Sequence, residues 1–420
     1  MGESQFRSRI LASTPADSNC FIGFHDIIPW SQDGSRLAIH RTNPAFCEMN
    51  HCSEPIEICL WHPENGQIEA VDTTTAWNYQ QGSRLQWLPG HSDIIVFNSI
   101  ENGRPVSVYR NVATRERRVV QAPIYAFSPD GKTSIAPNFT TLAHRWKAYG
   151  YPRLEKHPLI EDPDADGLWL VDVASGNQRL FISTGRVAEY LPLPTQDYSK
   201  HFLCHATFSP DGLHIVFLHR YFHPDGGLIS RMFVTDRDGK DLTMLAQEKV
   251  SHFDWLDEDS ILVWARFASG LAQVRSRGLF KSPLLAPFVR AARNFKGRWK
   301  QKLLSEAYYA ISISDPKSRR RFGWPNLEWD GHPMVARSHH WIVTDYYPSN
   351  QYAPVFLYNT HSSACLNVHT FQYNPRSLDS DVKCDLHPRW NRSERLIAVD
   401  TCESGYRQVR IVDVEDVVKA

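Results

Sequence analysis

The chain has 420 residues, of which 42% are hydrophobic, with 46 basic and 46 acidic side chains. This hydrophobic content excludes a disordered chain, and the zero formal charge excludes a uniformly basic nucleic-acid-binding protein. No apolar run is long enough for a signal sequence or a membrane-spanning helix, so we expect a cytoplasmic protein. The eight cysteines are scattered without CxxC pairs, which argues against a disulfide framework.

One pattern recurs seven times along the chain: an aromatic or apolar anchor, a polar turn and a β-branched run. The turn is Asp-Gly or a polar equivalent, which is typical of a β-hairpin. A second hairpin follows most of the first ones, so the repeated unit has four strands and about 40–50 residues. The anchors are Trp30, Trp87, Phe127, Phe208, Trp255, Val335 and Trp390.

Seven units of four strands predict an all-β fold, a single seven-bladed β-propeller over residues 1–420. The last unit lacks a fourth strand, and we expect the N-terminal residues 6–12 to supply it and close blade seven. Two long anchor spacings predict insertions at about 140–166 and 276–322, the second a short helical insertion between blades five and six. The alternative, two β-sandwiches joined by a linker, does not explain seven anchors in phase.

Four consecutive units carry a histidine three residues before the anchor. These are His205, His252, His332 and His387. Equivalent positions of a propeller converge on its central channel, so the four imidazoles predict a metal site or an acid/base site. A ladder of structural histidines between blades is the alternative. In the first unit, His25 and Asp26 stand slightly before this position.

The second strand of each blade returns to the same face, and its end carries polar side chains in several units. Guanidinium groups there would bind carboxylates or sulfates, and phenols would stack on sugars or donate protons. Ordinary ion pairing at the rim is the alternative. The predicted substrate contacts of this kind are Arg41, His219, Arg220, Arg266 and Tyr346. The insertion after the third unit would add a wall made of His144, Arg145, Tyr149 and Tyr151.

The strings FHDIIPWSQDG, CHATFSPDG, DGHPMV and CDLHPRW resemble those of the seven-bladed propeller polysaccharide lyases. The nearest are the oligogalacturonate lyase-like proteins and their ulvan lyase relatives. The resemblance covers nearly the whole chain and implies cleavage of a uronic-acid-containing oligo- or polysaccharide by β-elimination. It also implies a divalent metal, typically manganese, on three histidines and a glutamine, and no organic cofactor.

In this sequence His332 and His387 fall where two of the histidine ligands are expected. Asp385 stands at a further ligand position in place of a histidine, and no glutamine matches. The alternative is a structural zinc site made of Cys384, Cys402 and the two histidines, as the ulvan branch suggests.

Elimination needs a group that neutralises the uronate carboxylate, a base for the C5 proton and an acid for the leaving oxygen. We assign His205 as the base, Tyr149 or His252 as the acid, and Arg220 and Arg266 as the neutralising groups. Hydrolysis would more usually require a pair of carboxylates across the bond.

A non-catalytic propeller is the second functional class, because the fold alone does not determine whether a protein is an enzyme or a binding protein. Residues 276–302 are strongly basic, with apolar residues at roughly helical spacing. Such a segment predicts a peripheral contact with an anionic membrane or a lid that attracts a polyanionic saccharide. The alternative is a purely structural helix that packs on the side of the propeller, with its basic face in solvent. The second hypothesis is therefore binding of an anionic polysaccharide, or of a partner at the inner membrane face.

Overall fold

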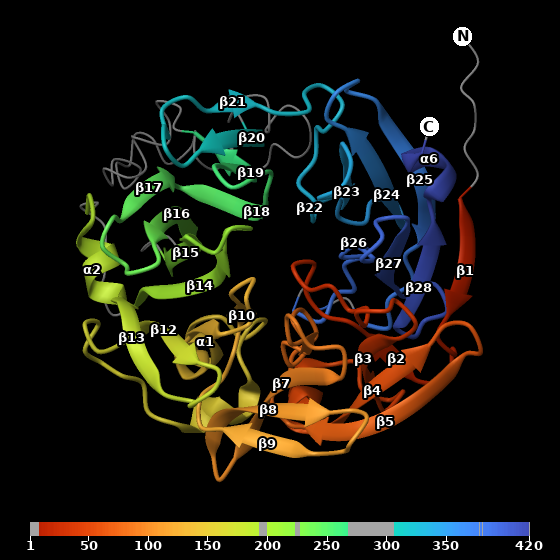
Figure 1. The fold of residues 1–420 in the computed structure, drawn as a ribbon, viewed down its shortest axis with the longest axis horizontal. Helices are drawn as coiled ribbons and strands as arrows, with labels where there is room; N and C mark the ends of the chain where they lie inside the picture. Colours follow the sequence, from red (N-terminus) through yellow and green to blue (C-terminus); the bar gives the residue numbers. More distant parts are fainter. Residues whose placement is uncertain are drawn as a thin grey trace, which may run out of the picture.

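The computed structural model describes residues 8–192, 200–222, 227–267, 306–377, 379 and 381–419. Seven four-stranded antiparallel sheets form a ring (Figure 1), so the chain is a seven-bladed β-propeller, as the repeats predict. No helix among these residues is long and apolar enough to span a membrane.

Each blade runs from an inner strand at the channel to an outer strand at the rim. Blade one comprises β2 (Asn19–Phe21), β3 (Leu37–Thr42), β4 (Ile56–His62) and β5 (Gln67–Thr74), and blade two comprises β6 (Gln86–Trp87), β7 (Ile94–Glu101), β8 (Arg104–Asn111) and β9 (Arg117–Val120). Blade three comprises β10 (Ala126–Phe127), β11 (Thr133–Pro137), β12 (Gly167–Asp172) and β13 (Gln178–Ser183). Blade four comprises β14 (Phe202–Phe208), β15 (His214–Phe222), β16 (Leu228–Asp236) and β17 (Thr243–Ala246).

Blades five to seven are built in the same way. Blade five comprises β18 (Lys249–Trp255), β19 (Ser260–Arg266), β20 (Glu306–Ser312) and β21 (Arg320–Arg321). Blade six comprises β22 (Met334–Val335), β23 (Trp341–Asp345), β24 (Tyr352–Asn359) and β25 (Cys365–Gln372). Blade seven comprises β26 (Arg389–Trp390), β27 (Leu396–Thr401), β28 (Gln408–Asp413) and β1 (Arg9–Ser13). The short helices are η1 (Met49–Ser53), α1 (Phe139–Arg145), η2 (Pro152–Lys156), α2 (Thr184–Glu189) and α6 (Glu415–Val418).

All seven anchors of the repeat are buried, and they pack between neighbouring blades. Two of them also link blades by hydrogen bonds: the indole N–H of Trp87 donates to the carbonyl of Pro29 at 2.7 Å, and that of Trp390 donates to Met334 at 3.0 Å. In the turn after Phe127, Asp130 accepts from Ser128 at 2.6 Å, and Gly131 has φ +68°, a conformation that favours glycine. The repeat therefore encodes both the hairpin and the contact between blades.

The outer strand of blade seven comes from the other end of the chain. β1 pairs antiparallel with β28, with Ile10 opposite Val412 and Ser13 opposite Arg410. The two ends of the chain thus share one sheet at the right of Figure 1, and the ring closes through backbone hydrogen bonds. The strand begins at Arg9, and residues 6 and 7 of the expected segment lie outside the described residues.

Both insertions interrupt a blade, which corrects their expected places between blades. The first joins β11 to β12 inside blade three and contains α1 and η2. The second separates β19 from β20 inside blade five, so the strand that begins at Glu306 completes blade five. The expected helix and basic segment at 276–302 lie outside the described residues. Because the second and third strands of a blade join on the face where the inner strands begin, the first insertion projects over the histidine face.

Candidate functional site

Five histidines from five consecutive blades surround the central channel. In ring order from blade four to blade one they are His205, His252, His332, His387 and His25. The ring centres of His252 and His332 are 4.1 Å apart, and those of His332 and His387 are 4.3 Å apart. His25 lies 5.5 Å from His332. The shared repeat position thus brings side chains together that are up to 182 positions apart in the sequence.

Local irregularities of the inner strands direct these histidines to the channel. In β14, residues 205 and 206 oppose one residue of β15, and in β18, residues 251 and 252 oppose one residue of β19. Such a bulge takes a residue out of the ladder and changes the direction of its side chain. In blades six and seven, the histidine is followed by Pro333 or Pro388, and the inner strand begins only after this proline.

His332, Asp385 and His387 form a cluster whose ligand atoms lie within 4.8 Å of one another. Nδ1 of His332 lies 2.8 Å from Asp345, and Nδ1 of His387 lies 2.7 Å from the carbonyl oxygen of Gly23. Both contacts fix the rings with Nε2 free to bind a cation, a common arrangement behind metal-binding histidines. Nε2 of His387 and Oδ1 of Asp385 are buried and have no hydrogen-bond partner in the part of the chain that the structure describes. Two imidazoles and a carboxylate with orphaned donor atoms fit a divalent metal.

His252 forms a dyad with Asp330, an aspartate of the loop between β21 and β22. Its Nδ1 lies 3.0 Å from Oδ1 of Asp330, and its Nε2 lies 3.4 Å from the hydroxyl of Tyr347. Burial alone would raise the pKa of Asp330, but the nearby His252 lowers it, so the aspartate is held as a carboxylate. A carboxylate on Nδ1 orients the ring and leaves Nε2 to accept a proton.

Arg220 is a buried arginine beside His205. Its Nη1 lies 3.5 Å from Nε2 of His205, and its guanidinium stacks on Trp146 at 4.3 Å from the ring centre. The Nε atom has no hydrogen-bond partner, and among the described residues no carboxylate forms an ion pair with this side chain. On its other side, Nδ1 of His205 lies 2.9 Å from the hydroxyl of Tyr125. An arginine buried without a counterion is a site for an anionic ligand.

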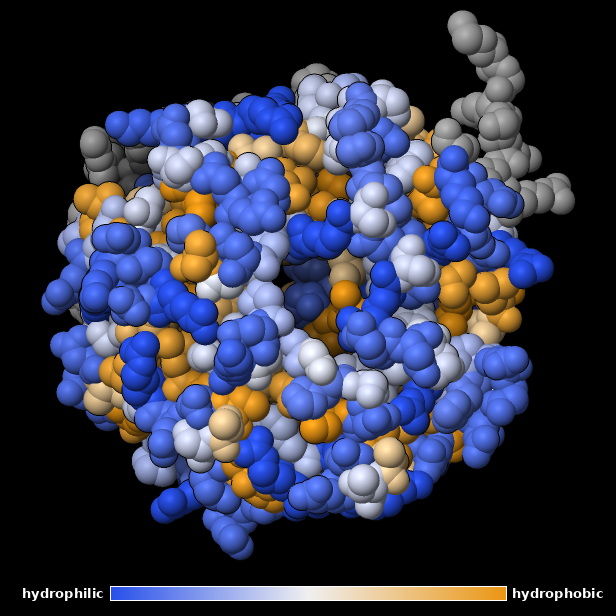
Figure 2. Space-filling model, in the orientation of Figure 1, coloured by the Kyte–Doolittle hydropathy of each residue, from blue (hydrophilic) through white to orange (hydrophobic). Residues whose placement is uncertain are grey.

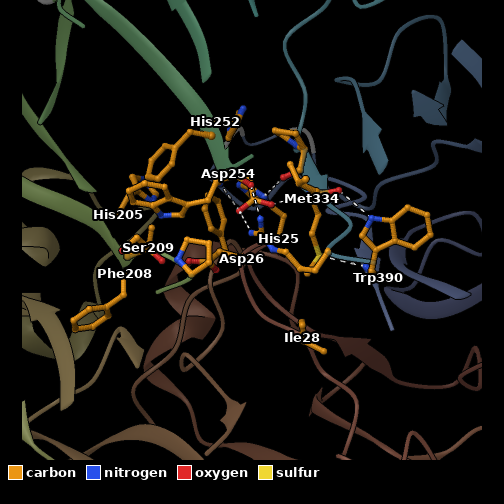
Figure 3. A pocket seen from close by; sticks show the side chains of 18 of the residues that line it. His25, Asp26, Ile28, His205, Phe208, Ser209, His252, Asp254, Met334 and Trp390 are labelled. Atoms are coloured by element: carbon orange, nitrogen blue, oxygen red, sulfur yellow. Dashed lines mark hydrogen bonds and ion pairs between the residues drawn. The ribbon is translucent and has the colours of Figure 1, made fainter. Parts of the chain in front are cut away.

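A cavity of about 500 Å³ lies at the centre of the ring, which is hollowed in the space-filling view (Figure 2). His25, His205 and His252 line it together (Figure 3), and so do Arg220 and Tyr149. The residues around the centre include Phe24, whose ring stacks on His205 at 5.1 Å and lies 5.2 Å from His387. Asp26, next to His25, forms a bidentate ion pair with the buried Arg84, with both distances 2.9 Å.

Four of the channel histidines are held neutral. Burial lowers the pKa of His25, His205, His332 and His387 well below the ordinary value. The positive charge of Arg220 lowers that of His205 further. Neutral imidazoles are the form that binds metals and accepts protons.

Several residues predicted to contact substrate do not line this cavity. They are Arg41, His144, Arg145, Tyr151, His219, Arg266 and Tyr346. For Arg41 and Arg266 the reason is a cross-strand partner: Arg41 pairs with Glu57 at 2.6 Å, and Arg266 pairs with Glu306. Each glutamate stands directly opposite its arginine on the third strand of the same blade. Near the end of the second strand, Arg220 therefore has no carboxylate partner among the described residues, whereas Arg41 and Arg266 are each paired with a glutamate.

The other predicted residues that fall outside the cavity contact the propeller itself. His144 contacts the carbonyl oxygen of His157, Tyr151 contacts Asn98, His219 contacts His201 and Tyr346 stacks on Phe356. Burial raises the pKa of Asp166, and the charge of Arg145 acts on this carboxyl in the opposite direction. The end of a second strand lies one strand away from the channel, so most of its side chains pack within or between blades. The number of residues between the anchor and such a side chain does not show whether the side chain faces the channel or packs within the blades.

Cys384 and Cys402 are free thiols outside the metal cluster. They hydrogen-bond to each other, and the described cluster consists of two histidines and Asp385. The group of possible metal ligands among the described residues therefore contains one carboxylate and two imidazoles, and the two thiols of the zinc alternative are not part of it.

Sequence reasoning missed several residues of the site: Phe24, Tyr125, Trp146, Asp330 and Asp345. One of them had a signal, because Asp-x-His-Pro occurs both at Asp330 and at Asp385. The others reach the site from a neighbouring blade or insertion, and nothing in their local sequence indicates this.

Comparisons with known proteins agree with the fold. No protein-family model and no curated protein matches the chain by sequence. Among solved structures, an oligogalacturonate lyase from Vibrio parahaemolyticus is 14% identical over 99% of this chain and 96% of its own, with a TM-score of 0.62. An oligogalacturonate lyase in complex with manganese is 13% identical over 99% and 98% of the two chains, also with a TM-score of 0.62. At these identities the similarity shows a shared seven-bladed propeller fold.

Proposed function

We propose that the protein is a lyase that cleaves uronic-acid-containing oligo- or polysaccharides by β-elimination. The observation that carries the proposal is Arg220, which is buried in the cavity without a carboxylate partner among the described residues. A uronate carboxylate would neutralise this charge, and the guanidinium would in turn stabilise the negative charge that develops when the C5 proton leaves. The oligogalacturonate lyases of similar fold support this substrate class.

The base in this proposal is His252, a change from the sequence-based assignment of His205. Asp330 accepts a hydrogen bond from Nδ1 of His252, which leaves Nε2 free to take the C5 proton. His205 instead has an arginine, an obligatory donor, near its Nε2. We assign His205 to substrate positioning beside Arg220.

Tyr149 is the proposed acid that protonates the leaving glycosidic oxygen. Its ring lies edge-on to His205 at 5.0 Å, and it lines the same cavity. Burial raises its pKa above the ordinary value, so the phenol keeps its proton near neutral pH. Elimination thus has a base and an acid from different blades.

A divalent metal, manganese or zinc, would be held by His332, Asp385 and His387, with Asp345 orienting the first of them. When bound, it would supply a Lewis acid next to the catalytic dyad. The manganese complex of the similar lyase supports this choice of ion.

The test is incubation with pectic, ulvan-like and glucuronic-acid-capped oligosaccharides while the ultraviolet absorbance of an unsaturated product is recorded. We expect at least one substrate to be cleaved, and His252→Ala to abolish cleavage while leaving thermal stability close to that of the parent protein. His91→Ala, at an exposed histidine outside the cavity, is the matched control. Retained cleavage in His252→Ala would reject the assigned base.

If no oligosaccharide of the panel is cleaved, but saccharide binding depends on Arg220, the protein is instead a non-catalytic binding protein. The dyad of His252 and Asp330 favours the lyase over this alternative, because binding an anion does not require an oriented proton acceptor.

A further inference from the structure

Cys384 and Cys402 are brought together by the backbone next to the metal cluster. β26 pairs with β27, and the contact continues beyond the strands, because the N–H of Asp400 donates to the carbonyl of Leu386 at 2.9 Å. The segments that contain the two cysteines therefore run side by side in opposite directions. Both thiols are buried, at 3% and 4% exposure.

The two sulfurs are in contact and unequal. The thiol of Cys384 donates a hydrogen bond to the sulfur of Cys402, and both side chains line the same small cavity. Arg407 lies beside both sulfurs and donates to the carbonyls of Val382 and Lys383 at 2.6 and 2.8 Å. Its positive charge stabilises a thiolate in this place.

A small molecule can reach the pair. Both cysteines line a cavity of about 30 Å³ together with Arg376 and Gly405, which lie at the surface. This volume exceeds what one water-sized molecule occupies. Hydrogen peroxide is only slightly larger than water and could enter the cavity.

We propose that Cys384 and Cys402 are a site of reversible disulfide formation whose oxidation weakens metal binding at the neighbouring cluster. With hydrogen peroxide as the oxidant, the sulfur of Cys402 attacks one oxygen, the O–O bond breaks, and a sulfenic acid and one water form. The sulfur of Cys384 then attacks the sulfenic sulfur, the S–S bond forms and a second water leaves. Two thiols are oxidised to one disulfide while one peroxide is reduced to two waters, and an external dithiol reverses the change.

The expected loss of metal affinity follows from the position of Cys384 in the chain, and it rests on the proposed metal site. Cys384 directly precedes Asp385, whose Oδ2 lies 3.0 Å from Nζ of Lys383. A disulfide requires the sulfurs to approach to about 2.05 Å. This movement displaces the backbone that positions the Asp385 carboxylate. We expect manganese affinity to fall about tenfold or more, the scale seen when support of a metal ligand is disturbed.

The experiment treats the full chain with hydrogen peroxide and maps disulfides by mass spectrometry of unreduced peptides. Manganese affinity is then measured by electron paramagnetic resonance before oxidation, after oxidation and after reduction with a dithiol. We expect a peptide that joins Cys384 to Cys402, weaker manganese binding, and recovery on reduction. Cys402→Ser should lose the response, while Cys365→Ser, at a cysteine on another blade, should respond like the parent protein.

Two free thiols after peroxide treatment of the folded chain would overturn the disulfide. A disulfide with unchanged manganese affinity would overturn its effect on the cluster. Neither readout uses cleavage of a saccharide, so a protein that cleaves no uronide would still support or reject this site. The parent protein serves as its own comparison through oxidation and reduction if Cys402→Ser does not fold.

Discussion

Arg41, Arg220 and Arg266 all lie near the end of the second strand of their blade, in blades one, four and five. The residue opposite each of them on the third strand decides what the arginine does. Glu57 and Glu306 stand opposite the first and the last, whereas Ser230 stands opposite Arg220. A serine cannot neutralise a guanidinium, so blade four keeps a cation for a ligand. Function at this position depends on one residue of the partner strand.

We predict that Ser230→Glu gives Arg220 the partner that its two counterparts have. Uronide affinity should fall by about tenfold to a hundredfold, because a substrate carboxylate must then displace an internal one. The melting temperature should be unchanged or higher, since a buried charge gains a partner. Titration calorimetry and thermal unfolding check both effects. Glu57→Gln, which frees Arg41 outside the cavity, should leave uronide affinity unchanged; equal affinity in Ser230→Glu would contradict the role of Arg220.

The contact between Asp330 and His252 gives a second prediction at this scale. Asp330→Asn keeps the size of the side chain but removes the charge that orients and supports the base. We expect kcat to fall by about a hundredfold or more while KM changes little, because general-base catalysis contributes on that scale. Steady-state kinetics on the best substrate of the panel provide the measurement. Asp172→Asn, at an exposed aspartate of β12, is the control, and a parallel rise in KM would mean that Asp330 binds substrate instead.

At the scale of strands and turns, the parts of the structure that depend on local sequence could be predicted. The blades follow from local chemistry, since each turn and each anchor is written within about 14 residues of sequence. The convergence of His205, His252, His332 and His387 follows from the repeat itself. The bulges in β14 and β18 and the contacts between blades could not be predicted, because they depend on residues far away in the chain. For that reason the histidines were found and most rim residues were misplaced.

The insertion in blade five was misplaced for a related reason. β20 begins at Glu306 after a long excursion of the chain from the end of β19 at Arg266, and its residues fall within the insertion expected at 276–322. Its pairing with β19, in which Tyr308 stands opposite Trp264, is a contact across that excursion. Spacing alone does not reveal which strand a returning segment joins.

The closing strand β1 gives a prediction at the scale of the element. Deleting residues 1–13 removes the outer strand of blade seven and leaves the edge of β28 without a partner. We expect a melting temperature lower by several degrees or more, because a loss of 1 kcal/mol already shifts it by about 2–4 °C in large domains. Deleting residues 1–7 leaves the β1 ladder intact and should have little effect. Equal melting of the two truncations would show that β1 contributes nothing to closure of the ring.

The whole molecule should lose stability in acid because of histidines that are buried neutral. In His40, Nε2 accepts from the backbone N–H of Ser83 at 3.0 Å, and Nδ1 lies 3.3 Å from the carbonyl of Phe21. The hydroxyl of Ser83 also lies 2.8 Å from Nε2, but burial away from solvent lowers the pKa of His40 to about 4. Above pH 6.5 both folded and unfolded chains are neutral at this residue. Between about pH 6.5 and 4 only the unfolded chain binds the proton, so stability falls by about 1.4 kcal/mol per pH unit.

His40→Gln isolates this contribution, since a glutamine can donate to Phe21 and accept from Ser83 without titrating. Urea unfolding across this pH range should show a smaller slope of stability against pH in the variant, by about one proton. The control is His91→Gln, at an exposed histidine, which should keep the slope of the parent protein. Parallel curves for His40→Gln and the parent protein would contradict a neutral His40.

A bound metal should stabilise the whole ring, because its ligands come from different blades. His332 precedes the inner strand of blade six, while Asp385 and His387 precede that of blade seven, and His387 also contacts Gly23 of blade one. An ion held by the cluster would therefore join the blades at the place where the ring closes. Binding to the folded chain alone adds about 2.7 kcal/mol of stability at a concentration one hundred times Kd. We expect the melting temperature to rise with manganese, fall with a chelator, and respond to neither in His332→Gln. His91→Gln should respond like the parent protein, and a melting temperature independent of metal in the parent protein would reject the cluster as a cation site.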